Sequence, residues 1–189
     1  LHVRSRRQRQ MCIRDSYIGG GFGNKQEVLY EPLNAWITTQ VGGRPVKLEC
    51  TREETFQNTR SRHPIHFDLK AAVGPDMRLM ARECRAVSNQ GGYASHGHAI
   101  VANAVTGFRQ TYPDVLAHRS EAWTVYTNLG STGAMRGYGI PQCNFAGECM
   151  MDDIAREMGW DPLEFRLKNS MPLGYVCLLY TSPSPRDVE

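Results

Sequence analysis

The chain has 189 residues, of which 41% are hydrophobic and 22% are charged, and its formal net charge is +3. This composition is typical of a globular domain and excludes collagen-like and intrinsically disordered chains. No stretch approaches the roughly 20 consecutive apolar residues of a membrane span, so we expect no membrane partner.

The two ends of the chain together account for its whole net charge, and the excess of positive charge lies in residues 1–16. Residues 1–16 carry five Arg and one Asp, residues 176–189 carry one Arg, one Asp and one Glu, and residues 17–175 carry 16 basic and 16 acidic side chains. A nucleic-acid-binding domain usually has a basic face in its folded part, so we expect no nucleic-acid partner. An Arg-rich nucleic-acid arm at 1–16 stays open as an alternative.

The ends also contain strings that resemble translated sequencing adapter, MCIRDS near the start and CLLYTSPSPRD near the end. We therefore expect 1–16 and 176–189 to be artefact or disordered tails, and 17–175 to form the folded domain.

The domain begins with a glycine-rich loop, IGGGFGN, at residues 18–24. Residues 26–40 carry apolar side chains at helical spacing, and Pro32 about two turns in indicates a kink or a late helix start. Residues 45–50 resemble a strand. Thr51 and Glu54 form a capping box that predicts a helix over 52–58.

A hairpin occupies the centre of the chain, with strands at 65–73 and 78–88 joined by the turn GPDM. A glycine-rich loop at 91–98, a short helix at 99–108 and a strand at 115–127 follow. This mixed order predicts an α+β fold rather than a repeated βαβ unit.

A second glycine-rich loop, GSTGAMRGYG at 130–139, precedes the clearest helix, at 142–158. We expect the buried face of that helix to contain five apolar side chains: Phe145, Cys149, Met150, Ile154 and Met158. Gly159 ends the helix, and Asp161 with Pro162 predicts a last helix over 162–169.

The four cysteines of 17–175, at positions 50, 84, 143 and 149, lack CxxC and zinc-finger spacing. We expect buried free thiols, typical of a cytoplasmic protein. His96 and His98 form an HxH pair without a third candidate ligand, and we interpret them as loop histidines rather than metal ligands.

Glycine loops that precede helices bind anions in many proteins, but they also serve as simple turns. Neither loop has the dinucleotide-binding or P-loop pattern. Together, however, GGGFGNKQE (19–27) and AMRGYGIPQ (134–142) resemble the two signature loops of the xanthine dehydrogenase and aldehyde oxidase family, in its large, molybdenum-binding subunit. The segments between the loops are RSRHP, NQGGYASHGH and YTNLGSTGAMRGYG, which runs into the second loop, and the segment after them is DDIAREMGWDPLEFRLKN, all in the family's order.

The resemblance covers 17–175, is nearest to bacterial xanthine dehydrogenase subunits, and implies a fragment of the molybdopterin-binding domain. It implies a molybdenum–molybdopterin cofactor and hydroxylation of a purine (xanthine or hypoxanthine) or a similar N-heteroaromatic ring with oxygen from water. Electrons would pass to iron–sulfur and FAD centres on partner subunits or domains. Aldehydes, nicotinate and aromatic acyl-CoA are alternative substrates within the family.

The resemblance also implies the site residues. Gly21, Phe22, Gly23 and Arg136 correspond to cofactor-binding positions, with Phe22 and Arg136 in the environment of the molybdenum. Gln26, Asn103 and Tyr138 correspond to substrate-binding positions.

Two positions depart from the purine-specific pattern, which has Glu where this chain has Gln26 and Arg where it has Asn103. Both changes remove charge and favour recognition by neutral hydrogen bonds, of a purine or of another N-heterocycle. The family's catalytic base is a Glu near the far C-terminus of the complete subunit, so we expect no catalytic residue in this fragment and no activity from it alone. The alternative of another class is a non-catalytic module whose loops bind only an anion or a protein.

Overall fold

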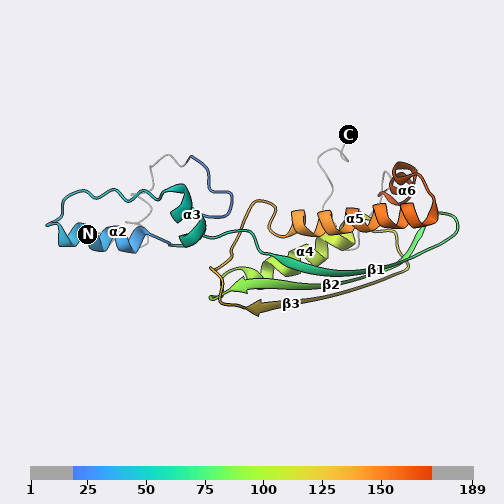
Figure 1. The fold of residues 1–189 in the computed structure, drawn as a ribbon, viewed down its shortest axis with the longest axis horizontal. Coiled ribbons are helices and arrows are strands. Elements are labelled where there is room, and N and C mark those ends of the chain that lie inside the picture. Colours follow the sequence, from blue (N-terminus) through green and yellow to red (C-terminus); the bar gives the residue numbers. More distant parts are fainter. Residues whose placement is uncertain (1–18, 172–189) are drawn as a thin grey trace, which may run out of the picture.

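The computed structural model describes residues 19–171, so the expected tails at 1–16 and 176–189, and the domain ends at 17–18 and 172–175, lie outside the described residues. Figure 1 shows the following elements: α2 (Glu31–Gln40), α3 (Arg52–Asn58), β1 (Ile65–Val73), β2 (Leu79–Gly91), α4 (Gly97–Thr111), β3 (Ala117–Tyr126), α5 (Ile140–Met158) and α6 (Pro162–Asn169).

The three strands form one mixed sheet in the order β1-β2-β3. The expected hairpin pairs β1 antiparallel with β2. β2 and β3 are parallel, and α4 provides the crossover between them. The expected α+β class is therefore confirmed, and the chain contains one βαβ crossover rather than a repeat of that unit.

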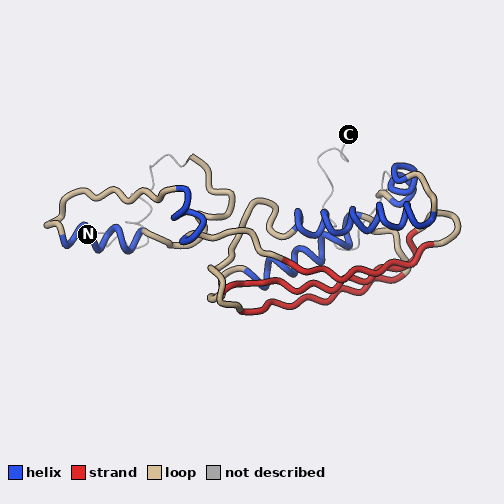
Figure 2. The backbone as a smooth tube through the Cα atoms, in the orientation of Figure 1, coloured by secondary structure: helices blue, strands red, loops and turns tan. Residues whose placement is uncertain are grey.

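Helices α4 and α5 cover one face of this sheet, as Figures 1 and 2 show. The centre of the covered face is a cluster of Cys84, Ala104, Phe108 and Cys143. A second cluster, at the hairpin end, joins α5 and α6 to the sheet through Leu79, Tyr112, Met151, Ala155 and Phe165. Loops, including the second glycine-rich loop, follow β2 and β3 at the end of the sheet where these strands finish.

Asn169, at the end of α6, ties this helix to the hairpin turn. Its Oδ1 accepts a hydrogen bond from the Leu79 amide at 2.8 Å, and its Nδ2 donates to the carbonyls of Met77 at 2.7 Å and Phe165 at 2.8 Å. The residue is only 3% exposed. A buried amide side chain is costly unless it is hydrogen-bonded, and these three bonds satisfy it. The two bonds to Leu79 and Met77 fix the position of α6 against the hairpin.

Arg82 is a buried cation beneath the end of α4. Its Nη2 donates to the carbonyl of Tyr112 at 2.6 Å, and its guanidinium lies 4.5 Å from the centre of the Phe108 ring. Burial lowers the pKa of Arg82 to about 10. On β3, burial, together with the charges of Arg82 and Arg109, lowers the pKa of His118 to about 4.

Several expected boundaries are confirmed. The Thr51 hydroxyl accepts from the Glu54 amide at 3.2 Å and the Glu54 carboxylate accepts from the Thr51 amide at 2.8 Å, which is the predicted capping box of α3. The Asp161 side chain caps α6 in the same way. α2 begins at Glu31 with Pro32 in its first turn, so the late start is confirmed.

The strand expected at 45–50 is wrong, because that segment is a loop. No strand among the described residues lies beside it, and a strand needs a partner for its amides and carbonyls. Asn34 Nδ2 donates to the Val46 carbonyl at 3.2 Å, and Lys47 forms an exposed ion pair with Glu49 within the segment.

The buried face expected for α5 is also wrong in most of its members. The buried residues are Cys143, Met151 and Ala155, whereas Phe145 is 75% exposed. Cys149 and Met158 are also exposed, and Met150 and Ile154 are partly buried. Gly147 continues the buried stripe, since a Cβ there would lie 3.4 Å from the Phe108 ring. Cys143 and Gly147 are small and lie four residues apart, which lets α5 approach Phe108 of α4 closely. Further along the same stripe, Met151 and Ala155 are buried in the cluster at the hairpin end.

All four cysteines are free thiols, as expected. The expected burial is confirmed for Cys84 and Cys143 and is wrong for the half-buried Cys50 and the exposed Cys149. α2 and α3 bury no residue and extend beyond the sheet, with Trp36 60% exposed. Within residues 19–171, the helices are too short or too polar to cross a membrane.

Candidate functional site

The two glycine loops meet beside the end of the sheet where β2 and β3 finish. Their contact is closest at Gly23, where a Cβ would lie 2.6 Å from the Ala134 carbonyl oxygen and 3.0 Å from the Met135 nitrogen. Gly23 also has a φ of +104°, a backbone conformation that residues with a side chain rarely adopt. Only glycine fits here, and its lack of a side chain lets the two backbones touch.

A hollow of about 190 Å³ lies between the loops. Its walls combine both signature segments: Phe22, Gly23, Gln26, Ala134, Met135, Arg136, Gly137 and Tyr138. The structure therefore brings together five of the seven predicted site residues. Of the other two, Gly21 lies in the first loop, where its carbonyl accepts from the Asn24 amide at 2.9 Å, and Asn103 lies behind Tyr138.

Arg136 is an exposed cation at the edge of this hollow. Its guanidinium carbon lies 6.0 Å from the centre of the Phe22 ring, which is itself 62% exposed. No acidic side chain among residues 19–171 forms an ion pair with Arg136. A guanidinium without a carboxylate partner is suited to an anionic or oxo ligand.

Two residues with side chains adopt left-handed backbone conformations at this site, Phe22 with φ +51° and Tyr138 with φ +49°. Each such residue costs on the order of 1 kcal/mol or more. Strain of this kind is often concentrated at ligand sites, where the surrounding structure maintains it.

Asn103, on α4, contacts the second loop directly. Its Nδ2 donates to the carbonyl of Tyr138 at 2.7 Å. No hydrogen bond within 19–171 involves its Oδ1, which leaves that atom available as an acceptor.

A polar cluster behind the first loop was not predicted from the sequence. Glu27 accepts from the Ser95 hydroxyl at 2.6 Å, lies 2.8 Å from His96 Nδ1 and forms an ion pair with Arg60. The His96 ring meets the Tyr138 ring edge-on, with 6.2 Å between centres. The only sequence signal was indirect, since RSRHP and NQGGYASHGH stood out as motifs without a role for these side chains.

The interpretation of the HxH pair as loop histidines is wrong for His98, because α4 begins at Gly97 and His98 lies in its first turn; His96 is the N-cap residue of this helix and contacts Glu27. Within the described chain, no three His, Cys, Asp or Glu side chains are grouped closely enough to hold a metal ion. Next to the cluster, His63 is buried, and burial lowers its pKa, which favours a neutral ring.

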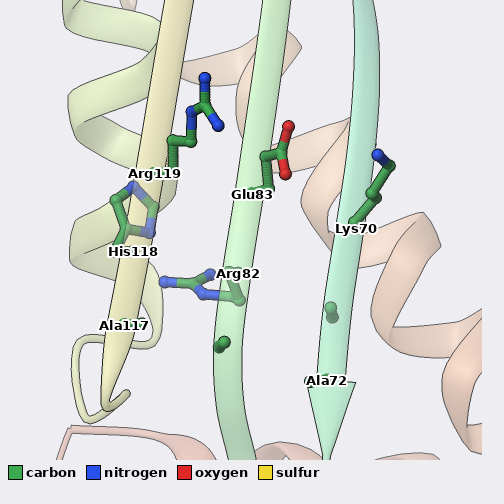
Figure 3. Close-up of a pocket in the computed structure, with 9 residues that line it drawn as sticks. Lys70, Ala72, Arg82, Glu83, Ala117, His118 and Arg119 are labelled. Atoms are coloured by element: carbon green, nitrogen blue, oxygen red, sulfur yellow. The ribbon is translucent and has the colours of Figure 1, made fainter.

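A second hollow, of about 360 Å³, lies at the opposite end of the sheet (Figure 3). Lys70, Glu83 and Arg119 line it from three neighbouring strands. None of the predicted site residues contributes to it, so the glycine loops remain the candidate site.

Comparison with known proteins shows the family of this chain. The family model of the molybdopterin cofactor-binding domain matches residues 3–170. The chain is 46% identical over 161 residues to the xanthine dehydrogenase molybdenum-binding subunit of Escherichia coli O157:H7, covering 84% of this chain and 21% of that protein. It is 34% identical over 158 residues to the nicotinate dehydrogenase large molybdopterin subunit of Eubacterium barkeri, covering 82% and 36%.

Among solved structures, the aldehyde oxidoreductase of Desulfovibrio gigas matches with a TM-score of 0.72 and 34% identity, covering 84% of this chain and 17% of that one. The chain thus spans about a fifth of the length of the xanthine dehydrogenase subunit that it matches. The family match includes both glycine loops and extends through α6. The chain therefore belongs to the molybdopterin cofactor-binding domain family, in the xanthine dehydrogenase and aldehyde oxidase group.

Proposed function

We propose that residues 17–175 contribute the two signature loops of the molybdenum site in an oxidoreductase that hydroxylates a purine or a similar N-heteroaromatic ring. The observation that carries this proposal is the convergence of Phe22 and Gly23 with Arg136 and Tyr138 on one hollow. When bound, the molybdenum–molybdopterin cofactor supplies the two-electron oxidation and the site for water-derived oxygen.

The chain's own residues fit such a cofactor. The contact of Gly23 with Ala134 aligns two stretches of bare backbone, and Arg136 adds a cation that no carboxylate of residues 19–171 neutralises. Preorganised donors and charges of this kind stabilise an anionic group without rearrangement. Gly21, Phe22 and Gly23 would hold the cofactor from one side and Arg136 from the other, with Phe22 and Arg136 beside the metal.

Three residues would contact the substrate. The Tyr138 ring offers a flat apolar surface to an aromatic ring. Gln26, exposed at the wall of the hollow, both donates and accepts hydrogen bonds without carrying charge, and Asn103 Oδ1 is a further neutral acceptor. This set suits a neutral N-heterocycle with both N–H donors and ring-nitrogen acceptors.

The similarity to a xanthine dehydrogenase subunit supports a purine as the substrate. The similarity to a nicotinate dehydrogenase subunit and an aldehyde oxidoreductase supports the alternatives within the same chemistry. Iron–sulfur and FAD centres on partner subunits or domains would accept the electrons. We place the protein in the cytoplasm because its four described cysteines are free thiols.

The test uses a full-length protein that carries this sequence, assayed with xanthine, hypoxanthine, nicotinate and an aromatic aldehyde. Arg136→Ala removes the unpaired cation and should lower the rate about a hundredfold or more. Arg156→Ala, which removes an exposed Arg paired with Asp153 on α5, is the matched control and should leave the rate unchanged. An undiminished rate in Arg136→Ala would favour a non-catalytic module, and a preference for nicotinate or aldehyde would replace the purine.

A further inference from the structure

The turn that carries Arg136 and Tyr138 has an unusual backbone. Gly137, Tyr138 and Gly139 have consecutive φ values of +92°, +49° and +98°. Two amide hydrogen bonds close the turn, from Tyr138 to the Met135 carbonyl at 2.8 Å and from Ile140 to the Gly137 carbonyl at 3.0 Å. Glycine adopts this conformation readily, but Tyr138 does not, so contacts from outside the turn must help to hold it.

Two side chains from separate elements supply such contacts. Asn103, on α4, donates from Nδ2 to the Tyr138 carbonyl at 2.7 Å. Arg62, in the segment before β1, donates from Nη2 to the Arg136 carbonyl at 2.7 Å. The two bonded carbonyls lie on either side of Gly137. The two hydrogen bonds therefore restrain the backbone both before and after this glycine, where it could otherwise rotate most freely.

Arg62 is itself fixed at its second nitrogen. Nη1 donates to Gln142 Oε1 at 3.2 Å, and Gln142 Nε2 donates to the His63 carbonyl at 3.1 Å. The guanidinium therefore joins the Arg136 carbonyl to the start of α5 and to the segment before β1. A planar fork with several donors can make both bonds at once, which a lysine ammonium at the same position cannot reproduce.

The turn also leaves little room for adjustment against α4. A Cβ at Gly139 would lie 2.4 Å from the Ile100 carbonyl oxygen and 3.2 Å from Ala104. A rotation of either bonded peptide would therefore redirect the side chains of Arg136 and Tyr138, because the turn cannot shift as a rigid unit toward the helix.

We propose that Arg62 and Asn103 are positioning residues that clamp the carbonyls of Arg136 and Tyr138 and thereby set where these two side chains lie in the site. The consequence for substrate binding rests on the proposed function, whereas the clamp itself does not. Asn103 then acts through the Tyr138 backbone in addition to any contact that its Oδ1 makes with a substrate.

The test compares Asn103→Asp and Arg62→Lys in the full-length protein. Asn103→Asp preserves size and the acceptor oxygen but replaces the donor that holds Tyr138. Arg62→Lys preserves the charge but loses the fork. Thr106→Ala, an exposed position one turn further along α4, is the matched control.

Hydrogen exchange of the peptide spanning 134–140 reports the turn without any need for activity. Each variant should speed this exchange about tenfold relative to the control, the usual effect of losing one hydrogen bond. Exchange in 79–90, within β2, should stay unchanged and serves as the check on folding. In the active enzyme, Asn103→Asp should raise KM for the ring substrate about tenfold and change kcat less than about threefold, because it releases the Tyr138 carbonyl. Arg62→Lys should also lower kcat, because it releases the carbonyl of Arg136.

Exchange and KM that match the Thr106→Ala control in both variants would overturn the clamp. A direct substrate role for Asn103 alone predicts unchanged exchange in Asn103→Asp, which would also contradict it. If Asn103→Asp does not fold, Arg62→Lys decides the outcome. An inactive wild-type protein whose variants still show the faster exchange would refute the proposed function and leave the clamp standing.

Discussion

Gly23→Ala is the sharpest perturbation of the site, because the new methyl group would lie 2.6 Å from the Ala134 carbonyl oxygen, 2.7 Å from its carbon and 3.0 Å from the Met135 nitrogen. These atoms belong to the backbone and cannot rotate away as a flexible side chain would. The φ of +104° at Gly23 adds a second penalty, since alanine rarely adopts it.

The two penalties can be estimated separately. A side chain forced into a sparsely populated backbone region costs about 1–3 kcal/mol, and a methyl group forced into packed space costs about 1–3 kcal/mol more. The contact between the glycine loops should therefore weaken by about 2–6 kcal/mol. At the lower limit this corresponds to a factor of about thirty in the equilibrium between closed and separated loops.

The assay is hydrogen exchange of the peptides spanning 20–27 and 134–140 in the full-length protein, together with its molybdenum content. Gly23→Ala should exchange at least about thirtyfold faster in both peptides and retain less molybdenum. Gly19→Ala is the control, because a Cβ at Gly19 meets nothing within 4 Å. Exchange and molybdenum content equal to this control would refute the argument that loop contact builds the site.

Further predictions concern stability and the polar cluster. Asn169→Ala removes two bonds between α6 and the hairpin and one within α6, and should lower the free energy of unfolding by about 3 kcal/mol, seen as a lower urea midpoint. His118 has a folded pKa of about 4 against an ordinary 6.5, so acid protonates the unfolded state first and stability falls from pH 6.5 toward 4. His118→Gln should flatten this part of the pH–stability curve, and an identical slope would contradict the assignment. Glu27→Ala leaves the largely buried Arg60 without its carboxylate, so exchange in 92–96 should rise more than in Glu27→Asp.

Local signals in the sequence predicted the local structure accurately. The Thr51–Glu54 capping box and the Asp161 cap lie where expected, because each depends on residues only three apart. The hairpin was also predictable, since its turn and both strands are contiguous. The strand expected at 45–50 failed because strand formation depends on a neighbour from elsewhere in the chain.

Long-range packing was harder to predict from the sequence than local structure. The parallel pairing of β2 with β3 depends on how α4 crosses the sheet, which no periodicity reveals. The buried face of α5 includes the small residues Cys143 and Ala155, whereas hydrophobicity predicted that Phe145, which is exposed, would be buried. At the site, the two loops were predictable as motifs. The contacts of Glu27 with Ser95 and His96 join segments more than 60 residues apart. The sequence motifs do not indicate that these two segments lie side by side.

The most direct measurement of the central claim is an anomalous difference map at the molybdenum absorption edge, from crystals of a full-length protein that carries this sequence. The proposed function predicts one strong peak facing the hollow between the two glycine loops, beside Phe22 and Arg136. A protein without molybdenum, or a peak remote from both loops, would contradict it.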